Sequence, residues 1–261
     1  MKGAREEEAF EKRLVTAFAP YLRLAEELVS VAEEMAEARP VLLNSAFDGL
    51  SAFFFSKSHK TFSAVLVLAS KGFGEDAAVL CRGLAENAIN FLYIREEPIR
   101  RADLYLEYEY VLRHMYLETL EAAGVLEGLA ASDGRQRVRE LYESVKRNYP
   151  NRHLWSGRSL REMAEEVGLS AHYRFAYKYF SDVAHGAPST ILQVLRPTEE
   201  PGFVRVEFGP TENLIKEALI WSSDLFWRIL VAYDQVFSLG MQGRLQDVAQ
   251  RMRSLFGTSL R

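Results

Sequence analysis

The stretch EDAAVLCRGLAENAINFLYIREE, residues 75–97, decides the fold class of this protein. Its apolar residues cover nearly the whole circumference of a helix, which is typical of a helix buried in a protein interior. Arg82, Glu86 and Asn90 are the exceptions, and their spacing of four residues places them in one stripe along that helix. We therefore expect the stripe to face either a polar partner, as in an intrahelical Arg82–Glu86 pair, or a cleft.

Helical spacing continues on both sides of this stretch. The expected helices cover residues 4–39, 42–70, 75–96, 98–123, 133–148, 159–167, 170–185, 211–239 and 242–256. We expect the first to be a surface helix, the second to form one long or two short core helices, and the last to be a C-terminal helix. This pattern predicts an all-α fold, a multi-helix bundle.

One segment breaks the helical pattern. TILQVLR, residues 190–196, and FVRVEF, residues 203–208, are short β-branched runs separated by the turn-forming PTEEPG. They predict a small β-hairpin insertion near residues 190–208. Because an isolated hairpin is marginally stable in water, we expect it to lie against the bundle beside the helix that carries His185.

Composition limits the class of protein further. No linker or repeat divides the 261 residues, so we expect a single helical domain over residues 1–261. The net charge of −4 is too small to attract nucleic acid or membranes as a whole, so any such partner needs a local patch. Cys81, the only cysteine, excludes an internal disulfide framework and a multi-cysteine zinc cluster. The charged N-terminal sequence and apolar runs well short of the roughly 20 residues of a membrane span predict a cytoplasmic protein with no membrane association.

A second polar face lies on the helix expected over residues 170–185. Tyr173, Tyr177, Ser181 and His185 follow one another at steps of four residues and therefore share one face. Hydroxyls and an imidazole in a line can position a phosphate, a ribose or a general base. A structural interpretation stays open, in which Ser181 bonds back to a carbonyl one turn earlier and His185 is a favourable cation at the helix C-terminus.

Residues 135–161 carry a surplus of positive charge with interleaved aromatic rings. The basic residues are Arg135, Arg137, Arg139, Lys146, Arg147, Arg152, Arg158 and Arg161. Tyr142, Tyr149, His153 and Trp155 are the aromatic ones. Basic groups neutralise phosphates and aromatic rings stack on bases, so this stretch has the composition of a nucleic-acid-binding surface. The alternative is a solvated, arginine-rich helix and loop.

No cofactor or resident metal is expected. GFGEDA, residues 72–77, is similar to the opening of a dinucleotide-binding motif, but no alternation of strands and helices surrounds it. The five histidines show none of the spacings of helical metal centres. A mononuclear site that mixes Glu86 and His185 stays open.

Three of these segments together resemble a known family. DAAVLCRGLAENAINFLYI, WSGRS at residues 155–159, and the Y-x-x-x-Y-x-x-x-S-x-x-x-H pattern of residues 173–185 resemble the uncharacterised bacterial domain of unknown function numbered 5677. The resemblance covers about residues 40–235. It implies an all-helical fold and a cluster of Arg82, Glu86, Tyr177, Ser181 and His185, and it brings no established activity.

A more distant resemblance is to HEPN domains, helical bundles of toxin–antitoxin and antiphage systems. Many of them are dimeric, metal-independent ribonucleases whose motif is an arginine followed by a histidine, as in Arg147 and His153. Pro150 departs from that family, because proline breaks the helix on which the pair is usually presented. The resemblance implies a homodimer, RNA as substrate and an antitoxin protein as partner.

Three functional hypotheses follow from these patterns. In a ribonuclease, the candidate catalytic residues are Arg82, Glu86, Ser181 and His185, with Arg147 and His153 as an alternative pair. Candidate binding residues are Asn90, Arg152, Trp155, Arg158, Tyr173 and Tyr177. The second hypothesis is a non-catalytic interaction module with a buried Arg–Glu–Ser–His network, and the third is a sensor of a nucleotide or small anion. All three predict that the Arg82–Glu86 stripe meets the Ser181–His185 face across two packed helices.

Overall fold

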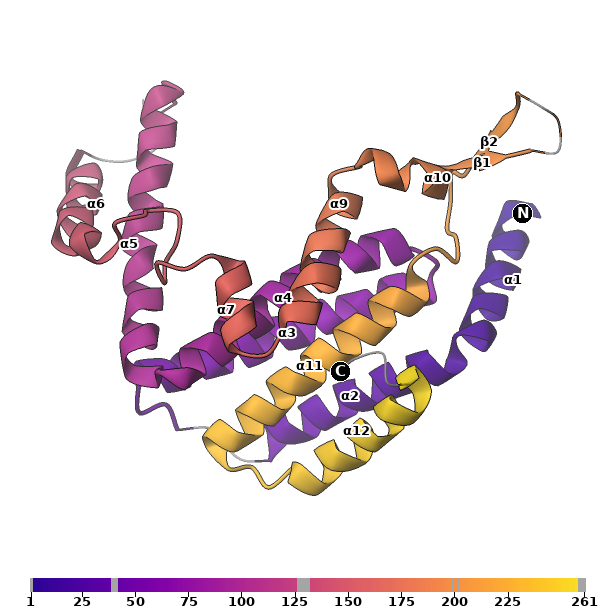
Figure 1. Ribbon diagram of the computed structural model, residues 1–261, viewed down its shortest axis with the longest axis horizontal. Helices are drawn as coiled ribbons and strands as arrows, with labels where there is room; N and C mark the ends of the chain where they lie inside the picture. The colour runs from indigo at the N-terminus through magenta and orange to yellow at the C-terminus, as the bar shows by residue number, and fades with distance from the viewer. Residues whose placement is uncertain (1, 39–41, 126–131, 199, 201, 258–261) are drawn as a thin grey trace.

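The computed structural model describes residues 2–38, 42–125, 132–198, 200 and 202–257 (Figure 1). Its longer helices are α1 (Lys2–Ala17), α2 (Ala19–Glu37), α3 (Ala46–Ser70), α4 (Gly74–Glu96), α5 (Pro98–Ala122), α6 (Ser132–Val145), α11 (Ile215–Phe237) and α12 (Gln242–Phe256). The shorter elements are η1 (Lys146–Asn148), α7 (Leu160–Glu166), α8 (Ser170–His172), η2 (Tyr173–Tyr179), α9 (Phe180–Ala184), η3 (Pro188–Thr190), α10 (Ile191–Val194), β1 (Leu195–Pro197) and β2 (Val204–Val206). The all-α fold is therefore confirmed.

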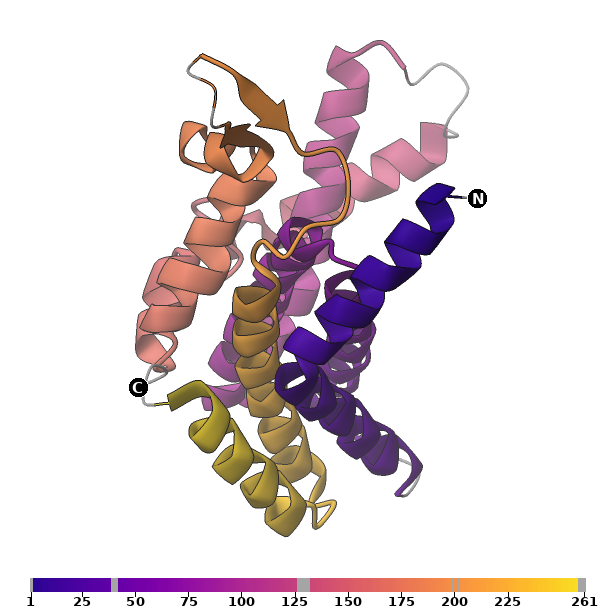
Figure 2. The same cartoon turned by 90° about the vertical axis from the view of Figure 1, so that its right-hand side faces the viewer.

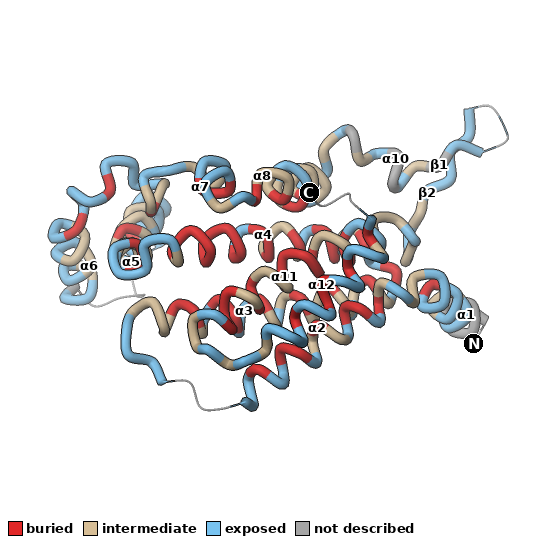
Figure 3. Tube along the Cα trace, turned by 60° about the horizontal axis from the view of Figure 1, so that its bottom comes forward, coloured by how far each residue is buried: buried red, intermediate tan, exposed pale blue. Residues whose placement is uncertain are grey.

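The core lies where α2, α3, α4 and α11 pack together (Figure 3). Phenylalanine rings fill it: Phe62 stacks on Phe226 with centroids 4.5 Å apart, and Phe54 stacks on Phe91 at 5.8 Å. Each such side chain stabilises the fold by about 1.5–3 kcal/mol through removal of apolar surface from water. The stretch of residues 75–97 forms α4 and is mostly buried, as its apolar circumference predicted.

Gly74 permits the close approach of α4 to α11. A Cβ atom at this position would lie 2.0 Å from the carbonyl oxygen of Asn213 and 2.6 Å from the backbone nitrogen of Ile215. Backbone atoms cannot move aside cheaply, so only glycine fits here. The N-terminal end of α4 is thereby packed directly against the start of α11.

The two ends of the bundle differ in shape. At one end, α5 extends beyond the core and α6 packs beside it, around a small second cluster of Val111, Val145 and Tyr149 (Figures 1 and 2). At the other end lie α1 and the β1–β2 hairpin. Within the described residues, no helix is both long and apolar enough to cross a membrane.

The segment expected as one surface helix, residues 4–39, consists of two helices. α1 ends at Ala17 and α2 starts at Ala19, with Pro20 in its first turn. Proline has no N–H to donate and is tolerated only in the first turn, so the chain bends here and begins a new helix. α2 is also a core element rather than a surface helix, since seven of its side chains are buried. Arg39 and Pro40 lie outside the described residues.

The hairpin exists, but it is shorter than expected. Leu195, Arg196 and Pro197 pair antiparallel with Val206, Arg205 and Val204, whereas residues 188–194 form short helical turns. Its expected position against the bundle is wrong. The β2 residues are exposed on both faces, and the hairpin projects beyond α10 (Figure 1). It is connected to the bundle at residues 188–194 and again where the Thr211 N–H donates to the Gly72 carbonyl.

The segment expected as one α-helix over residues 170–185 contains a π-helix. Seven residues, Tyr173–Tyr179, form η2 between the short α8 and α9. A π-helix has i→i+5 hydrogen bonds and more residues per turn than an α-helix, so its side chains are distributed differently around the helix axis. Tyr173 and Tyr177, four residues apart, stack on each other within this segment, and π-helical segments occur frequently at functional sites.

Candidate functional site

Arg82 joins the two predicted polar faces. α4 packs against both η2 and α9, and the Arg82 guanidinium lies over the ring of Tyr177 at 4.8 Å from its centroid. Arg82 Nη2 also donates a long hydrogen bond of 3.4 Å to the Tyr177 hydroxyl. Tyr173 stacks on Tyr177 with centroids 5.3 Å apart, so the guanidinium and two tyrosine rings form one group.

The positive charge of Arg82 has no counterion among the described residues. Glu86, one helical turn away, is exposed and forms no ion pair with Arg82 in the part of the chain that the structure describes. The Nε atom of Arg82 is buried and has no hydrogen-bond partner. Removing a charged group from water without a partner is unfavourable. Arg82 is half-buried and therefore suited to bind an anion.

The remainder of the stripe along α4 serves the packing of α5 and the loop before α7. Burial raises the pKa of Tyr105 on α5, and the nearby charge of Glu86 raises it further. Asn90 is buried and its Oδ1 accepts a hydrogen bond of 3.0 Å from the Trp155 indole. The Trp155 ring packs edge-on against Tyr93 and Tyr105. Asn90 and Trp155, two predicted binding residues, are therefore bonded to each other in the interior.

Ser181 and His185 lie on α9 and at its C-terminal end. Ser181 is half-buried and His185 is exposed. The His185 backbone N–H donates to the Ser181 carbonyl at 3.0 Å and closes the helix. Among the described residues, no side-chain hydrogen bond or ion pair joins Arg82, Glu86, Ser181 and His185 to one another. Since Glu86 and His185 are exposed, these four residues do not form a buried network.

The alternative pair, Arg147 and His153, is not presented on one helix. Arg147 lies in η1, which ends at Asn148, and Pro150 follows in an irregular segment that leads to the exposed His153. The buried Tyr149 fixes this segment, because its hydroxyl donates to the Leu104 carbonyl at 2.7 Å.

Most basic side chains of residues 135–161 have acidic partners. The ion pairs are Arg137–Glu140, Arg139–Glu121, Lys146–Glu143, Arg152–Glu118, Arg158–Glu166 and Arg161–Glu165. Four of the acids, Glu118, Glu121, Glu165 and Glu166, lie outside residues 135–161, so the sequence of that stretch alone overstates its free positive charge. Arg152 and Arg158, two predicted binding residues, are paired in this way.

A buried charged cluster lies behind η2, and the sequence interpretation missed it. His172 Nε2 lies 2.5 Å from Asp224 Oδ2, and the same oxygen accepts a hydrogen bond of 2.6 Å from Arg228 Nε. Burial raises the pKa of the Asp224 carboxyl, but the bond to His172 and the charge of Arg228 outweigh it and hold that pKa below its ordinary value. An aspartate in the apolar stretch IWSSDLFWRIL was the available signal.

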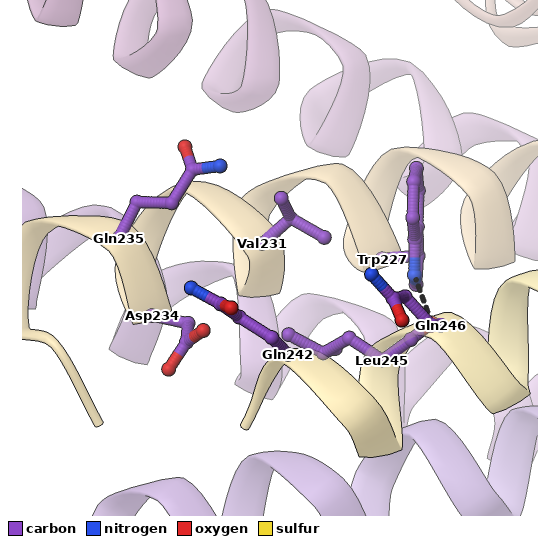
Figure 4. Close-up of a pocket in the computed structure, with 7 residues that line it drawn as sticks. All are labelled: Trp227, Val231, Asp234, Gln235, Gln242, Leu245 and Gln246. Atoms are coloured by element: carbon purple, nitrogen blue, oxygen red, sulfur yellow. Dashed lines mark hydrogen bonds between the residues drawn. The ribbon is translucent and has the colours of Figure 1, made fainter. Parts of the chain in front are cut away.

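Two of the molecule's hollows border α11. An open groove of about 620 Å³ lies between η2 and the first half of α11, lined by Ala171, Arg174, Phe175, Tyr179, Leu214, Glu217 and Trp221. A smaller pocket of about 280 Å³ lies between α11 and α12 (Figure 4). In this pocket Asp234 accepts the Met241 backbone N–H at 3.0 Å, and the Trp227 indole donates to the Leu245 carbonyl. Asp234 and Trp227 therefore stabilise the α11–α12 turn.

Metal-binding chemistry has no built site in the part of the chain that the structure describes. No group of three or more His, Cys, Asp or Glu side chains gathers there in a way that could hold a metal ion. Burial raises the pKa of the Cys81 thiol, so this side chain is a poor ligand and a poor nucleophile.

Comparison with known proteins identifies a family without a known activity. No curated protein and no solved structure matches this chain. One family model matches residues 48–203 of the chain. This range is shorter at both ends than the resemblance over residues 40–235, and it ends before α11. Residues 48–203, more than half of the chain, match the model of the family of unknown function DUF5677, and the chain belongs to that family.

Proposed function

We propose that this protein binds an RNA phosphodiester where α4 meets η2 and α9, and cleaves it without a metal. The half-buried Arg82, which has no carboxylate partner in the described chain, is the observation that carries the proposal. Arginine binds phosphate through several N–H donors in a planar fork. Arg82 has only one long hydrogen bond, to Tyr177, so its terminal Nη donors stay available to a ligand, whereas its Nε is buried.

His185 supplies the acid–base chemistry in this proposal. The neutral imidazole takes the proton of a ribose 2′-hydroxyl, and the 2′ oxygen then attacks phosphorus. The bond from phosphorus to the 5′ oxygen breaks, a 2′,3′-cyclic phosphate forms, and the leaving oxygen takes a proton from solvent. Arg82 stabilises the negative charge that develops on the phosphoryl oxygens, and Ser181 lies on α9 between Tyr177 and His185 as a further hydrogen-bond donor.

A second candidate function is a sensor that binds a nucleotide or another small anion at Arg82 without cleaving it. The state of His185 favours this candidate, because the imidazole is exposed and no described side chain orients it. Catalytic histidines are usually held by a second group that fixes the tautomer.

Paired binding and cleavage assays separate the two candidates. Single-stranded and structured RNA are incubated with the protein, with and without a chelator, and binding is measured by anisotropy at two salt concentrations. We expect Arg82→Ala to lose binding and cleavage, and His185→Ala to lose cleavage by about 10²–10⁴-fold with binding retained. Arg147→Ala is the matched control and should change neither by more than a small factor. Helicity is measured for every variant.

The other outcomes are equally informative. Binding without cleavage in the unmodified protein favours the sensor. Cleavage that persists in both Arg82→Ala and His185→Ala contradicts the proposal and makes Arg147 and His153 the candidate catalytic pair. The HEPN resemblance adds that the active species is a homodimer paired with an antitoxin protein. Light scattering of the purified chain tests the dimer, and co-purification with the product of a neighbouring gene tests the antitoxin.

A further inference from the structure

The groove between η2 and α11 lies on a different side of the π-helix from Arg82. Phe175 and Tyr179 line the groove, whereas Tyr177 contacts Arg82 and is not part of the lining. The π-helical turn therefore presents aromatic rings in two directions. One set of rings borders the unpaired arginine, and the other borders an open volume of about 620 Å³.

The groove contains a stacked aromatic platform that is accessible to solvent. Phe175 stacks on Trp221 with centroids 5.2 Å apart and an interplanar angle of 15°. Tyr179 approaches Phe175 with centroids 5.9 Å apart and an interplanar angle of 55°. The Phe175 side chain is 49% exposed, although a ring of this size is usually buried when only packing determines its place. A planar aromatic ligand can continue such a stack.

The interior holds Trp221 in place. The His172 ring packs against it edge-on, with centroids 5.3 Å apart and an angle of 87°. His172 is 2% exposed and is bonded to Asp224, which Arg228 holds in turn. The platform is therefore fixed before a ligand arrives, which lowers the entropy lost on binding.

Two charged side chains at the groove define the chemistry of the ligand. Arg174 donates only a long bond of 3.4 Å to the Ser170 carbonyl, and it forms no ion pair within the described residues. Its remaining N–H groups suit a phosphate. Glu217, in the first turn of α11, is exposed and has no ion-pair partner there either. A carboxylate accepts hydrogen bonds from the exocyclic amino group of a base.

We propose that this groove is a base-stacking subsite for an amino-bearing nucleobase of single-stranded RNA. The base stacks on Phe175 and Trp221, its amino group donates to Glu217, and Arg174 contacts the attached phosphate. The inference rests on the proposed function in one respect, namely that RNA supplies the base. Adenine, guanine and cytosine have the amino group that Glu217 recognises, whereas uracil lacks it.

Titration with mononucleotides tests the groove independently of cleavage. AMP and UMP are added to the full chain, tryptophan fluorescence reports binding, and inorganic phosphate is the reference for charge alone. We expect quenching by AMP, weaker quenching by UMP and none by phosphate. Phe175→Ala should weaken AMP binding by about 5- to 150-fold, which corresponds to the stacking energy of one base.

Phe53→Ala is the matched control, because Phe53 lies on α3 away from the groove and is 48% exposed, almost the same as Phe175. It should leave AMP binding unchanged. Glu217→Gln should reduce the preference for AMP over UMP. Equal effects of Phe175→Ala and Phe53→Ala, or equal quenching by phosphate and AMP, would overturn the assignment.

RNA oligonucleotides distinguish the source of the base. Competition of a single-stranded adenine-containing oligonucleotide with AMP supports RNA as the ligand. AMP binding without competition by RNA supports the base site but overturns its assignment to RNA. If the protein binds AMP but cleaves no RNA, the base-stacking subsite is supported and only the ribonuclease proposal is refuted. Failure of the subsite can therefore be distinguished from failure of the proposed cleavage.

Discussion

Arg82 and Arg101 each lie over a tyrosine ring, yet their surroundings differ in charge. Arg101 is 6% exposed, its guanidinium lies 3.7 Å from the centroid of Tyr93, and it donates to Glu97, Glu166 and the Tyr93 carbonyl. Arg82 is 4.8 Å from the Tyr177 centroid and donates one long bond to its hydroxyl. The first cation is compensated by two carboxylates, and the second has none among the described residues.

Arg101 therefore has a structural role, whereas Arg82 is the residue to which we assign binding in our proposal. Arg101 connects α5 to the end of α4 and to α7, so its ion pairs position three helices relative to one another. Asp224 belongs to the same compensated class, because His172 and Arg228 share one of its oxygens. Arg101 and Asp224, whose bonds connect neighbouring elements, thus both have partners within the fold. Arg82 differs, because no carboxylate pairs with it among the described residues.

Loss of the Arg101 side-chain charge should have the largest effect on stability. Arg101→Met removes the side-chain donor of the Tyr93 carbonyl, and it takes one of two arginine partners from Glu97, which keeps Arg100, and from Glu166, which keeps Arg158. We expect it to lower the free energy of unfolding by about 2 kcal/mol. Urea denaturation followed by circular dichroism measures this loss. A loss of free energy of unfolding below about 1 kcal/mol would show that Arg101 contributes no more to stability than Arg82, and it would contradict the structural role of Arg101.

The stability that Glu97 gains from its arginine partners should depend on pH. Hydrogen bonds from Arg100 and Arg101 lower the pKa of Glu97 to about 2, from an ordinary value of 4.5. A carboxylate with a lowered folded pKa contributes stability above its unfolded pKa, and this contribution is lost as the pH falls toward the folded pKa. The stability difference between the unmodified protein and Glu97→Gln should therefore be constant above pH 4.5 and shrink as the pH falls toward 2.

Denaturation series at pH 7, 4 and 3 measure this difference. Glu109→Gln is the control, since Glu109 pairs with Arg113 in an exposed i,i+4 bridge, and such bridges contribute about 0.5 kcal/mol or less. A Glu97→Gln effect that does not change with pH would contradict the expected linkage.

The smallest effect on stability is expected at Arg82. Because no counterion would be left unpaired, Arg82→Met should change the free energy of unfolding by less than about 1 kcal/mol, and it relieves the buried, unpartnered Nε atom. The adjacent Cys81 provides a local readout, since its buried thiol reacts only when α4 opens. Alkylation of Cys81 should stay slow in Arg82→Met and become faster in Arg101→Met. Fast alkylation in Arg82→Met would show that Arg82 has a structural role.

The burial and the ends of α4 could be predicted from its own residues. An apolar circumference requires burial on all sides, and Pro98 marks the boundary with α5, so the helix could be predicted with its ends. The break at Pro20 was equally local and could have been read from the sequence, because proline lacks the N–H that a continuous helix needs.

The partners of the charged side chains could not be predicted in this way. Tyr177 is 95 residues from Arg82, and Asp224 is 52 residues from His172. Spacing along a helix says which residues share a face, but it does not say which distant face packs against it. The basic stretch of residues 135–161 shows the same limit, since Glu118 and Glu121 neutralise two of its arginines from α5.

By itself, the sequence determined a helical protein with a central apolar helix, a short hairpin and a polar stripe of Arg82, Glu86 and Asn90 on the central helix. The tertiary structure decided which charges are compensated, and it converted the expected α-helix of residues 170–185 into a π-helical segment with two aromatic sides. The physical reason is that helix formation depends on neighbouring residues, whereas charge compensation and the π-helical register depend on which side chains the fold brings together.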